Sequence, residues 1–138
     1  MTWSGVDERG LPLNYGFKPE YEATPREVKA LLDSAPDRVL LVDCRTAPEW
    51  EVARVPGSVH VPLDELDARV DELPVDGREV FVLCHHGVRS MKGTLLLRSH
   101  GIENARSVAG GIDCWSLAAD AGVPRYERSA GVCRPLGG

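Results

Sequence analysis

This chain contains the segment Val80-Phe-Val-Leu-Cys84-His-His-Gly-Val-Arg89-Ser90, in which a cysteine ends a short apolar run and a glycine, an arginine and a serine follow within six residues. The apolar run predicts a buried strand, and the residues after Arg89 predict a helix. A turn from a strand into a helix leaves backbone N–H groups without intrahelical partners, and the helix dipole adds partial positive charge there. We therefore expect Cys84 to be a reactive thiol that favours its nucleophilic thiolate form.

Two polar residues close this segment, and each has two candidate roles. Arg89 either steers an anionic substrate or braces the loop by pairing with a carboxylate, because arginine suits both bidentate tasks. The hydroxyl of Ser90 either donates to the thiolate or caps the helix. Gly87 permits a close backbone approach. A cysteine with a simple packing role would need neither this glycine nor this arginine, so we favour the nucleophile interpretation.

The residues between them are expected to act mainly through the backbone. The amides from His85 to Ser90, that of Val88 included, would surround the sulfur and stabilise negative charge on it. The side chains of His85 and His86 either contact an acceptor at the rim or point to water. A metal ion held by Cys84 and both histidines is disfavoured, because adjacent residues in a tight loop rarely converge on one ion. We expect no metal site and no cofactor.

At these residues the chain resembles the rhodanese family, whose active-site loop runs from a catalytic cysteine to an arginine over six residues. Two further family signatures resemble segments of this chain, roughly within residues 21–119. The first is carried by Leu41-Val-Asp-Cys-Arg45, Glu49-Trp50 and Val55-Pro-Gly-Ser-Val-His-Val-Pro62, and the second by Val108-Ala-Gly-Gly-Ile-Asp-Cys-Trp115. One departure is Ala53-Arg54, where the family usually carries Gly-His.

The resemblance implies a sulfurtransferase. In that chemistry the Cys84 thiolate attacks the sulfane sulfur of thiosulfate or of a persulfide, and carries it as a persulfide until a thiophilic acceptor takes it. One alternative is a phosphatase or arsenate reductase, but four residues between Cys84 and Arg89, where that class carries five, suit one sulfur better than a phosphoryl group. The other is a non-enzymatic interaction module, which we expect to lack the cysteine or the arginine.

The carboxyl-terminal part bears on the partners. The segment Gly111-Ile-Asp-Cys-Trp-Ser-Leu-Ala-Ala-Asp120, with Val123-Pro-Arg-Tyr126, resembles the ending of rhodanese domains fused to adenylating enzymes that activate small sulfur-carrier proteins. Besides a small sulfur donor, the resemblance thus implies a sulfur-carrier protein as a partner, with a thioredoxin-like protein as another acceptor. The ending Gly137-Gly138, on which sulfur carriers form a thiocarboxylate, is interpreted as incidental.

Composition limits the class of protein. The 138 residues are 43% hydrophobic, enough for one core. A net charge of −5 with 16 basic residues disfavours nucleic acid as a partner. No apolar segment has the length of a membrane span or a signal peptide, so we expect no membrane association and a cytoplasmic location. Four cysteines without a C-x-x-C pair fit a reducing compartment.

The pattern of residues predicts an α/β fold. Thr24-Pro-Arg-Glu27 has the form of a capping box with proline at the first helical position. Residues 38–43 form a second apolar run, and such runs predict strands covered on both faces. Further helices are predicted at residues 63–73, 90–100 and 111–119. We expect a rhodanese-like parallel sheet of about five strands flanked by helices on both faces, with the site at the carboxyl ends of the strands.

We divide the chain into an irregular N-terminal arm at residues 1–20, the rhodanese-like domain at 21–126 and a C-terminal tail at 127–138. Within the domain, we interpret Asp43, Arg45 and Glu49 as an ion-pair set that braces strand to helix rather than as catalytic acids.

The remaining cysteines have open roles. Cys44 ends the strand predicted beside that of Cys84, so it either shares the crevice or packs in the core. Cys114 is expected in the core. Cys133 either forms a disulfide with Cys84 or is an exposed thiol.

Overall fold

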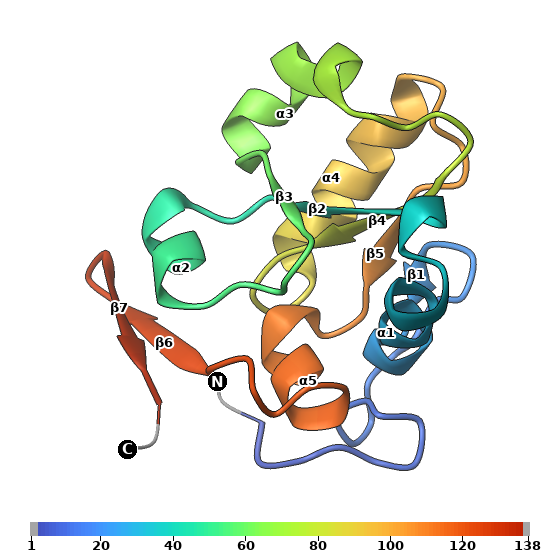
Figure 1. Ribbon diagram of the computed structural model, residues 1–138. Helices are drawn as coiled ribbons and strands as arrows, with labels where there is room; N and C mark the ends of the chain where they lie inside the picture. The colour runs from blue at the N-terminus through green and yellow to red at the C-terminus, as the bar shows by residue number, and fades with distance from the viewer. Residues whose placement is uncertain (1–2, 137–138) are drawn as a thin grey trace.

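A five-stranded parallel sheet forms the centre of the computed structural model, which describes residues 3–136 (Figure 1). The strand order is β1-β5-β4-β2-β3. The strands are β1 (Glu22–Ala23), β2 (Val39–Asp43), β3 (Val59–His60), β4 (Glu79–Leu83) and β5 (Arg106–Val108). The two central strands, β2 and β4, carry the predicted apolar runs, and the predicted fold class is confirmed.

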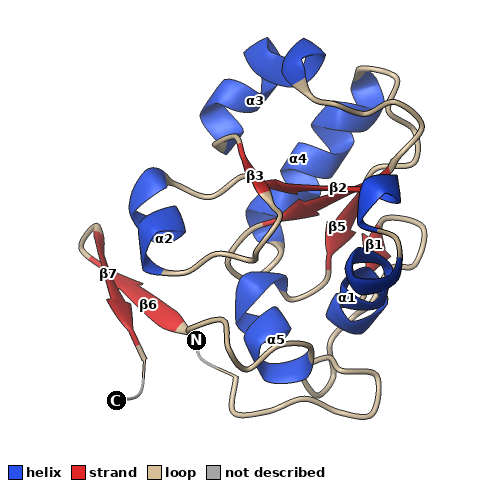
Figure 2. Ribbon diagram, in the orientation of Figure 1, coloured by secondary structure: helices blue, strands red, loops and turns tan. Residues whose placement is uncertain are grey.

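Helices cover both faces of the sheet (Figure 2). They are α1 (Pro25–Ser34), α2 (Ala47–Val52), α3 (Leu63–Arg69), α4 (Val88–Ser99) and α5 (Gly111–Ala118), with short 3-10 turns η1 (Pro36–Arg38) and η2 (Val70–Glu72). Helices α1 and α5 pack with the odd-numbered residues of β2 and β4, and α3 and α4 pack with the even-numbered ones. Both strands are therefore almost wholly buried, which explains why their sequence is apolar without alternation.

Local signals place several of these helices. Helix α1 starts where predicted, because the Thr24 hydroxyl accepts a hydrogen bond from the Glu27 N–H and the Glu27 carboxylate accepts one from the Thr24 N–H.

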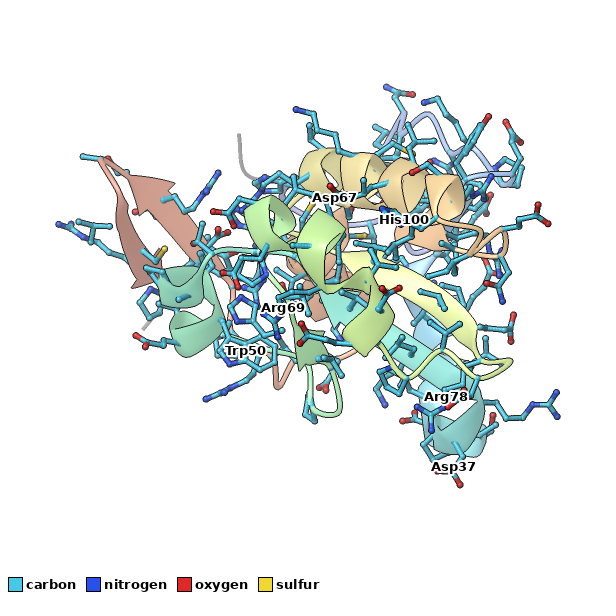
Figure 3. The ribbon with its side chains drawn as sticks, turned by 90° about the horizontal axis from the view of Figure 1, so that it is seen from above. Asp37, Trp50, Asp67, Arg69, Arg78 and His100 are labelled. Atoms are coloured by element: carbon cyan, nitrogen blue, oxygen red, sulfur yellow. The ribbon has the colours of Figure 1, made fainter. Side chains whose placement is uncertain are left out.

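On the face of the sheet that α3 and α4 cover, the His100 ring nitrogen lies 2.7 Å from the carboxylate of Asp67, which joins the end of α4 to α3 (Figure 3). None of the helices in residues 3–136 is both long and apolar enough to cross a membrane.

Residues 3–20 form turns without a helix or strand. Leu11 of this arm is fully buried with Ala109 and Cys114, and Trp3 and Tyr15 pack against that cluster. The arm therefore extends the core beside α5.

The predicted C-terminal tail contains a β-hairpin. Strand β6 (Tyr126–Ser129) pairs antiparallel with β7 (Val132–Pro135), and β7 contacts α2. The turn between them uses a positive φ at Ala130 (51°) and at Gly131 (77°). Alanine is not a typical residue for that conformation, so the turn signal at these residues is weak. Gly137-Gly138 lies outside the described residues.

The start of α5 supports the segment that follows β4. The N–H groups of Ile112 and Asp113 donate to the carbonyl oxygens of Cys84 (2.8 Å) and His85 (3.1 Å). Gly111 makes this approach possible, because its φ is 64° and a Cβ there would lie 2.5 Å from the carbonyl oxygen of Cys84. Two carbonyls of the loop, those of Cys84 and His85, are thus bonded to α5.

We predict that Gly111→Ala destabilises the protein more than Gly57→Ala does. Both glycines have positive φ, but nothing lies within 4 Å of a Cβ added at Gly57. The left-handed backbone costs each variant about 1–2 kcal/mol, and overpacking adds about 1–3 kcal/mol at Gly111 alone. Urea unfolding measures both, and equal losses of unfolding free energy would contradict this account of the contact.

Candidate active site

Cys84 follows β4 and is 1% exposed. Its Sγ accepts a hydrogen bond of 3.0 Å from the Gly87 N–H and lies 3.2 Å from Oγ of Ser90. Gly87 adopts a φ of 103°, so the chain turns back on the sulfur before α4 begins at Val88. One backbone N–H and one hydroxyl, those of Gly87 and Ser90, thereby reach the sulfur atom at the start of a helix.

Ser90 contacts the sulfur. Its hydroxyl also lies 2.7 Å from that of Ser107 on β5, which forms a buried chain of polar groups from Cys84 to Ser107. Gly87 occupies the N-cap position of α4, so the capping role considered for Ser90 is not the one it has. In the thiol form Cys84 donates to Ser90, and in the thiolate form the serine hydroxyl is placed to donate to the sulfur.

Arg89 braces the loop. It donates two hydrogen bonds to Glu49, from Nη1 to Oε1 at 2.7 Å and from Nη2 to Oε2 at 2.9 Å. Glu49 lies on α2 and is fully buried, whereas the Arg89 side chain is 22% exposed. This is the bidentate geometry that arginine forms with a carboxylate. The hydrogen bonds to Glu49 raise the pKa of Arg89 above its usual range, so the guanidinium stays charged.

Glu49 has further partners. Its carboxylate accepts hydrogen bonds from the hydroxyls of Tyr126 (2.5 Å) and Thr46 (2.9 Å) and from the Arg128 guanidinium (3.2 Å). Burial alone would raise the pKa of Glu49, but the hydrogen bonds from Arg89 and Tyr126 outweigh it and hold the pKa well below its usual range. One carboxylate therefore connects α2 to α4 and to the C-terminal hairpin.

The interpretation of Asp43, Arg45 and Glu49 as one ion-pair set is corrected here. Arg45 pairs with the Asp43 carboxylate at 2.7 Å and donates to the backbone carbonyls of Glu49 and Ala53, so it does brace β2 against α2. The Glu49 side chain instead pairs with Arg89. Sequence spacing favours the near neighbour Arg45 as the partner of the Glu49 carboxylate. The fold instead brings Arg89, 40 positions away, onto that carboxylate.

The two histidines of the loop have different surroundings. His85 is 6% exposed and stacks between the rings of His86 and Tyr126, with centroid distances of 3.9 and 4.1 Å. Burial, together with the neighbouring His86, lowers the pKa of His85 to about 4. The interpretation that its side chain points to water is therefore wrong. His86 is partly exposed and lies 3.6 Å from the carboxylate of Asp113.

A pocket of about 390 Å³ lies between this loop and the hairpin. Its walls are His85, His86 and Asp113 on one side and residues 126–131 on the other. The sequence did not predict it, because residues 127–138 carry no clear strand pattern. Strand β6 reads Tyr-Glu-Arg-Ser and buries its first residue alone, so no alternation of apolar and polar residues marks it.

The group of described residues that could hold a metal ion is His85, His86 and Asp113, whose ligand atoms lie within 4.8 Å of one another. Two features disfavour it. The histidine rings are stacked with 27° between their planes rather than directed at a common point. Arg125 donates hydrogen bonds to both oxygens of Asp113, and the neighbouring His86 and Arg125 outweigh burial and lower the pKa of the carboxyl to about 2.

The family model of the rhodanese-like domain matches residues 24–118. The chain belongs to this family. The matched residues include Cys84, the loop and Glu49, whereas the C-terminal hairpin lies beyond them.

Known proteins similar to this rhodanese-like domain include longer chains. It is 29% identical over 130 residues to "Adenylyltransferase and sulfurtransferase UBA4" of Lodderomyces elongisporus, covering 88% of this chain and 28% of that protein. It is 33% identical over 76 residues to "Putative sulfur carrier protein YrkF" of Bacillus subtilis, covering 55% of this chain and 40% of the other. The solved structure of the human single-domain sulfurtransferase TSTD1 matches with a TM-score of 0.59 and 26% identity, over 68% of this chain and 93% of that one.

We predict that Glu49→Gln destabilises the rhodanese-like domain by about 3 kcal/mol, because it leaves the largely buried guanidinium of Arg89 facing a neutral amide. Glu51→Gln is the matched control, since Glu51 is exposed on the same helix. Urea unfolding provides the measurement. A loss for Glu49→Gln no larger than that for Glu51→Gln would show that the carboxylate does not hold the loop.

We also predict that unfolding becomes easier as the pH falls from about 6.5 to about 4, in part through His85. In this window the unfolded chain binds a proton at this histidine, but the folded chain does not until its pKa of about 4 is reached. His85→Gln should therefore reduce the slope of unfolding free energy against pH. An unchanged slope, measured by urea unfolding across this window, would contradict the assignment of a neutral buried histidine.

Proposed function

We propose that this rhodanese-like domain is a sulfurtransferase that moves one sulfane sulfur through a persulfide on Cys84. The observation that carries the proposal is the convergence of the Gly87 N–H and the Ser90 hydroxyl on Sγ at the start of α4. These donors stabilise negative charge on sulfur, first on the thiolate and then on the persulfide.

The reaction has two halves. The Cys84 thiolate attacks the outer sulfur of the donor, the donor's S–S bond breaks, and its electron pair leaves with sulfite when the donor is thiosulfate or with a thiolate when it is a persulfide. Cys84 then carries the terminal sulfur as Cys84–S–S⁻. In the second half, a nucleophilic acceptor attacks that terminal sulfur and returns the Cys84 thiolate.

The charges around the loop favour an anionic donor such as thiosulfate. Glu49 supplies one negative charge to two guanidinium groups, those of Arg89 and Arg128, so this cluster has an excess positive charge. Arg128 is 46% exposed and lines the pocket beside the loop. A partly exposed guanidinium whose carboxylate partner is shared is available to a second anion.

We propose a sulfur-carrier protein as the acceptor, and a thioredoxin-like protein as the alternative. The names of two relatives, an adenylyltransferase and sulfurtransferase and a putative sulfur carrier protein, support the first. Exposed apolar side chains at Val88 on the loop (69%) and Val132 on β7 (49%) provide contact area for a protein. A cytoplasmic location stays a prediction.

Mass spectrometry and two activity assays distinguish the sulfurtransferase from the two alternatives, a phosphatase and an interaction module. After incubation with thiosulfate, we expect the peptide that contains Cys84 to gain one sulfur atom. With cyanide as the acceptor, we expect the protein to form thiocyanate. The variant Cys84→Ser should show neither the added sulfur nor thiocyanate formation. Hydrolysis of an aryl phosphate without any sulfur gain would favour the phosphatase. Absence of both activities with several persulfide donors would favour the module.

We predict that Arg128→Gln raises the KM for thiosulfate about tenfold, the loss of roughly one charge-assisted hydrogen bond, with little change in kcat. Arg134→Gln is the matched control, because Arg134 is exposed on the partner strand and pairs in register with Glu127 rather than lining the pocket. Steady-state kinetics measure both. Equal KM values for the two variants would remove Arg128 from the donor site.

A further inference from the structure

Cys44 lies directly beside the nucleophile. Strands β2 and β4 are parallel and in register from Val39 opposite Glu79 to Asp43 opposite Leu83, so the next pair is Cys44 and Cys84. The two cysteines also belong to the same apolar cluster, on the face of the sheet that α3 and α4 cover. The alternation of side chains along both strands therefore places the two thiols on one face at the same end of the sheet.

The spacing of the strands allows a covalent bond between these residues. Neighbouring strands lie about 4.8 Å apart, and disulfides join Cα atoms that are about 4.4–6.8 Å apart. The backbone of Cys44 is fixed at this point, because its N–H donates to Leu83 (2.9 Å) and its carbonyl accepts from Leu63 (3.0 Å). The strand spacing at this register position is therefore within the range of Cα separations that a disulfide joins.

The other two cysteines are placed elsewhere. Cys114 is fully buried between α5 and the N-terminal arm, where its thiol donates to the carbonyl of Gly10 at 3.1 Å. Cys133 packs against the core on the opposite face of the sheet from Cys84. The disulfide between Cys84 and Cys133 that the sequence left open is therefore disfavoured.

We propose that Cys44 is an oxidative modification site that protects the nucleophile: when a peroxide oxidises Cys84, Cys44 closes a Cys44–Cys84 disulfide. The inference goes beyond sulfur transfer and needs only an oxidisable sulfur at Cys84.

The reaction proceeds in two steps with hydrogen peroxide as the oxidant. The Cys84 thiolate attacks one peroxide oxygen, the O–O bond breaks, and hydroxide leaves, which gives the sulfenic acid Cys84–SOH. The hydroxide released in this step takes the thiol proton of Cys44 as water, the resulting Cys44 thiolate attacks the Cys84 sulfur, the S–O bond breaks, and hydroxide leaves. A dithiol reductant later supplies two electrons and restores both thiols.

The environment of Cys44 limits it to this reaction. It is 2% exposed, and burial, together with the neighbouring Cys84 and Asp43, raises the pKa of its thiol above the usual range. The residue therefore stays protonated at neutral pH and does not compete with Cys84 for a sulfur donor or for peroxide. It reacts when an electrophilic sulfur is generated beside it.

The test uses the full chain, reduced and then treated with hydrogen peroxide. Digestion under non-reducing conditions should give a cross-linked pair of peptides that contains Cys44 and Cys84 and is lighter by two hydrogen atoms than the two reduced peptides together. Treatment with dithiothreitol should restore thiosulfate-dependent activity. In Cys44→Ser the disulfide cannot form, Cys84 advances to the sulfinic or sulfonic acid, and the recovered activity falls about tenfold.

Cys133→Ser is the matched control and should recover like the wild type. Cys44→Ala serves as a second variant, because a serine hydroxyl in this buried site can impair folding. The proposal is overturned when the wild type gives no Cys44–Cys84 peptide, and equally when both Cys44 variants recover as fully as the wild type. Failure of sulfur transfer is recognised separately, since it appears as a missing sulfur gain on reduced protein that was never exposed to peroxide.

Discussion

The loop from Cys84 to Ser90 has to turn its N–H groups toward one sulfur atom, and this requires other partners for its carbonyls. Helix α5 provides them, because the N–H groups of Ile112 and Asp113 donate to the carbonyl oxygens of Cys84 and His85. Gly111 lets the two segments approach closely enough. The starts of two helices thus hold the hydrogen bond from Gly87 to Sγ in place. Gly87 is the N-cap of α4, and the first residues of α5 bind the carbonyls of the loop.

A single buried carboxylate connects this loop to the rest of the site. Glu49 pairs with Arg89 of α4 and also accepts from Tyr126 and Arg128 of the hairpin. The hairpin, which lies beyond the residues matched by the family model, is consequently part of the same hydrogen-bonded network as the loop. The network joins the hairpin to the loop and leaves Arg128 partly exposed at the pocket.

Much of the fold was predictable because its signals are local. The apolar runs of β2 and β4 and the capping box at Thr24 each specify an element within a few residues. The same holds for the loop, where the order of cysteine, glycine and arginine indicates the turn. Contacts between distant segments were not predictable in this way. From the sequence, Arg89 could equally well steer an anionic substrate or pair with a carboxylate. Its partner Glu49, which decides for the second role, lies 40 residues away. The pocket depends on a hairpin whose turn begins with alanine.

The most direct test of the central claim is a crystal structure of the protein after exposure to thiosulfate, with the anomalous signal of sulfur recorded. The account predicts one additional sulfur bonded to Sγ of Cys84 and within hydrogen-bonding distance of backbone N–H groups of residues 85–90. An unmodified Cys84, or a sulfur atom bound at another cysteine, would contradict it.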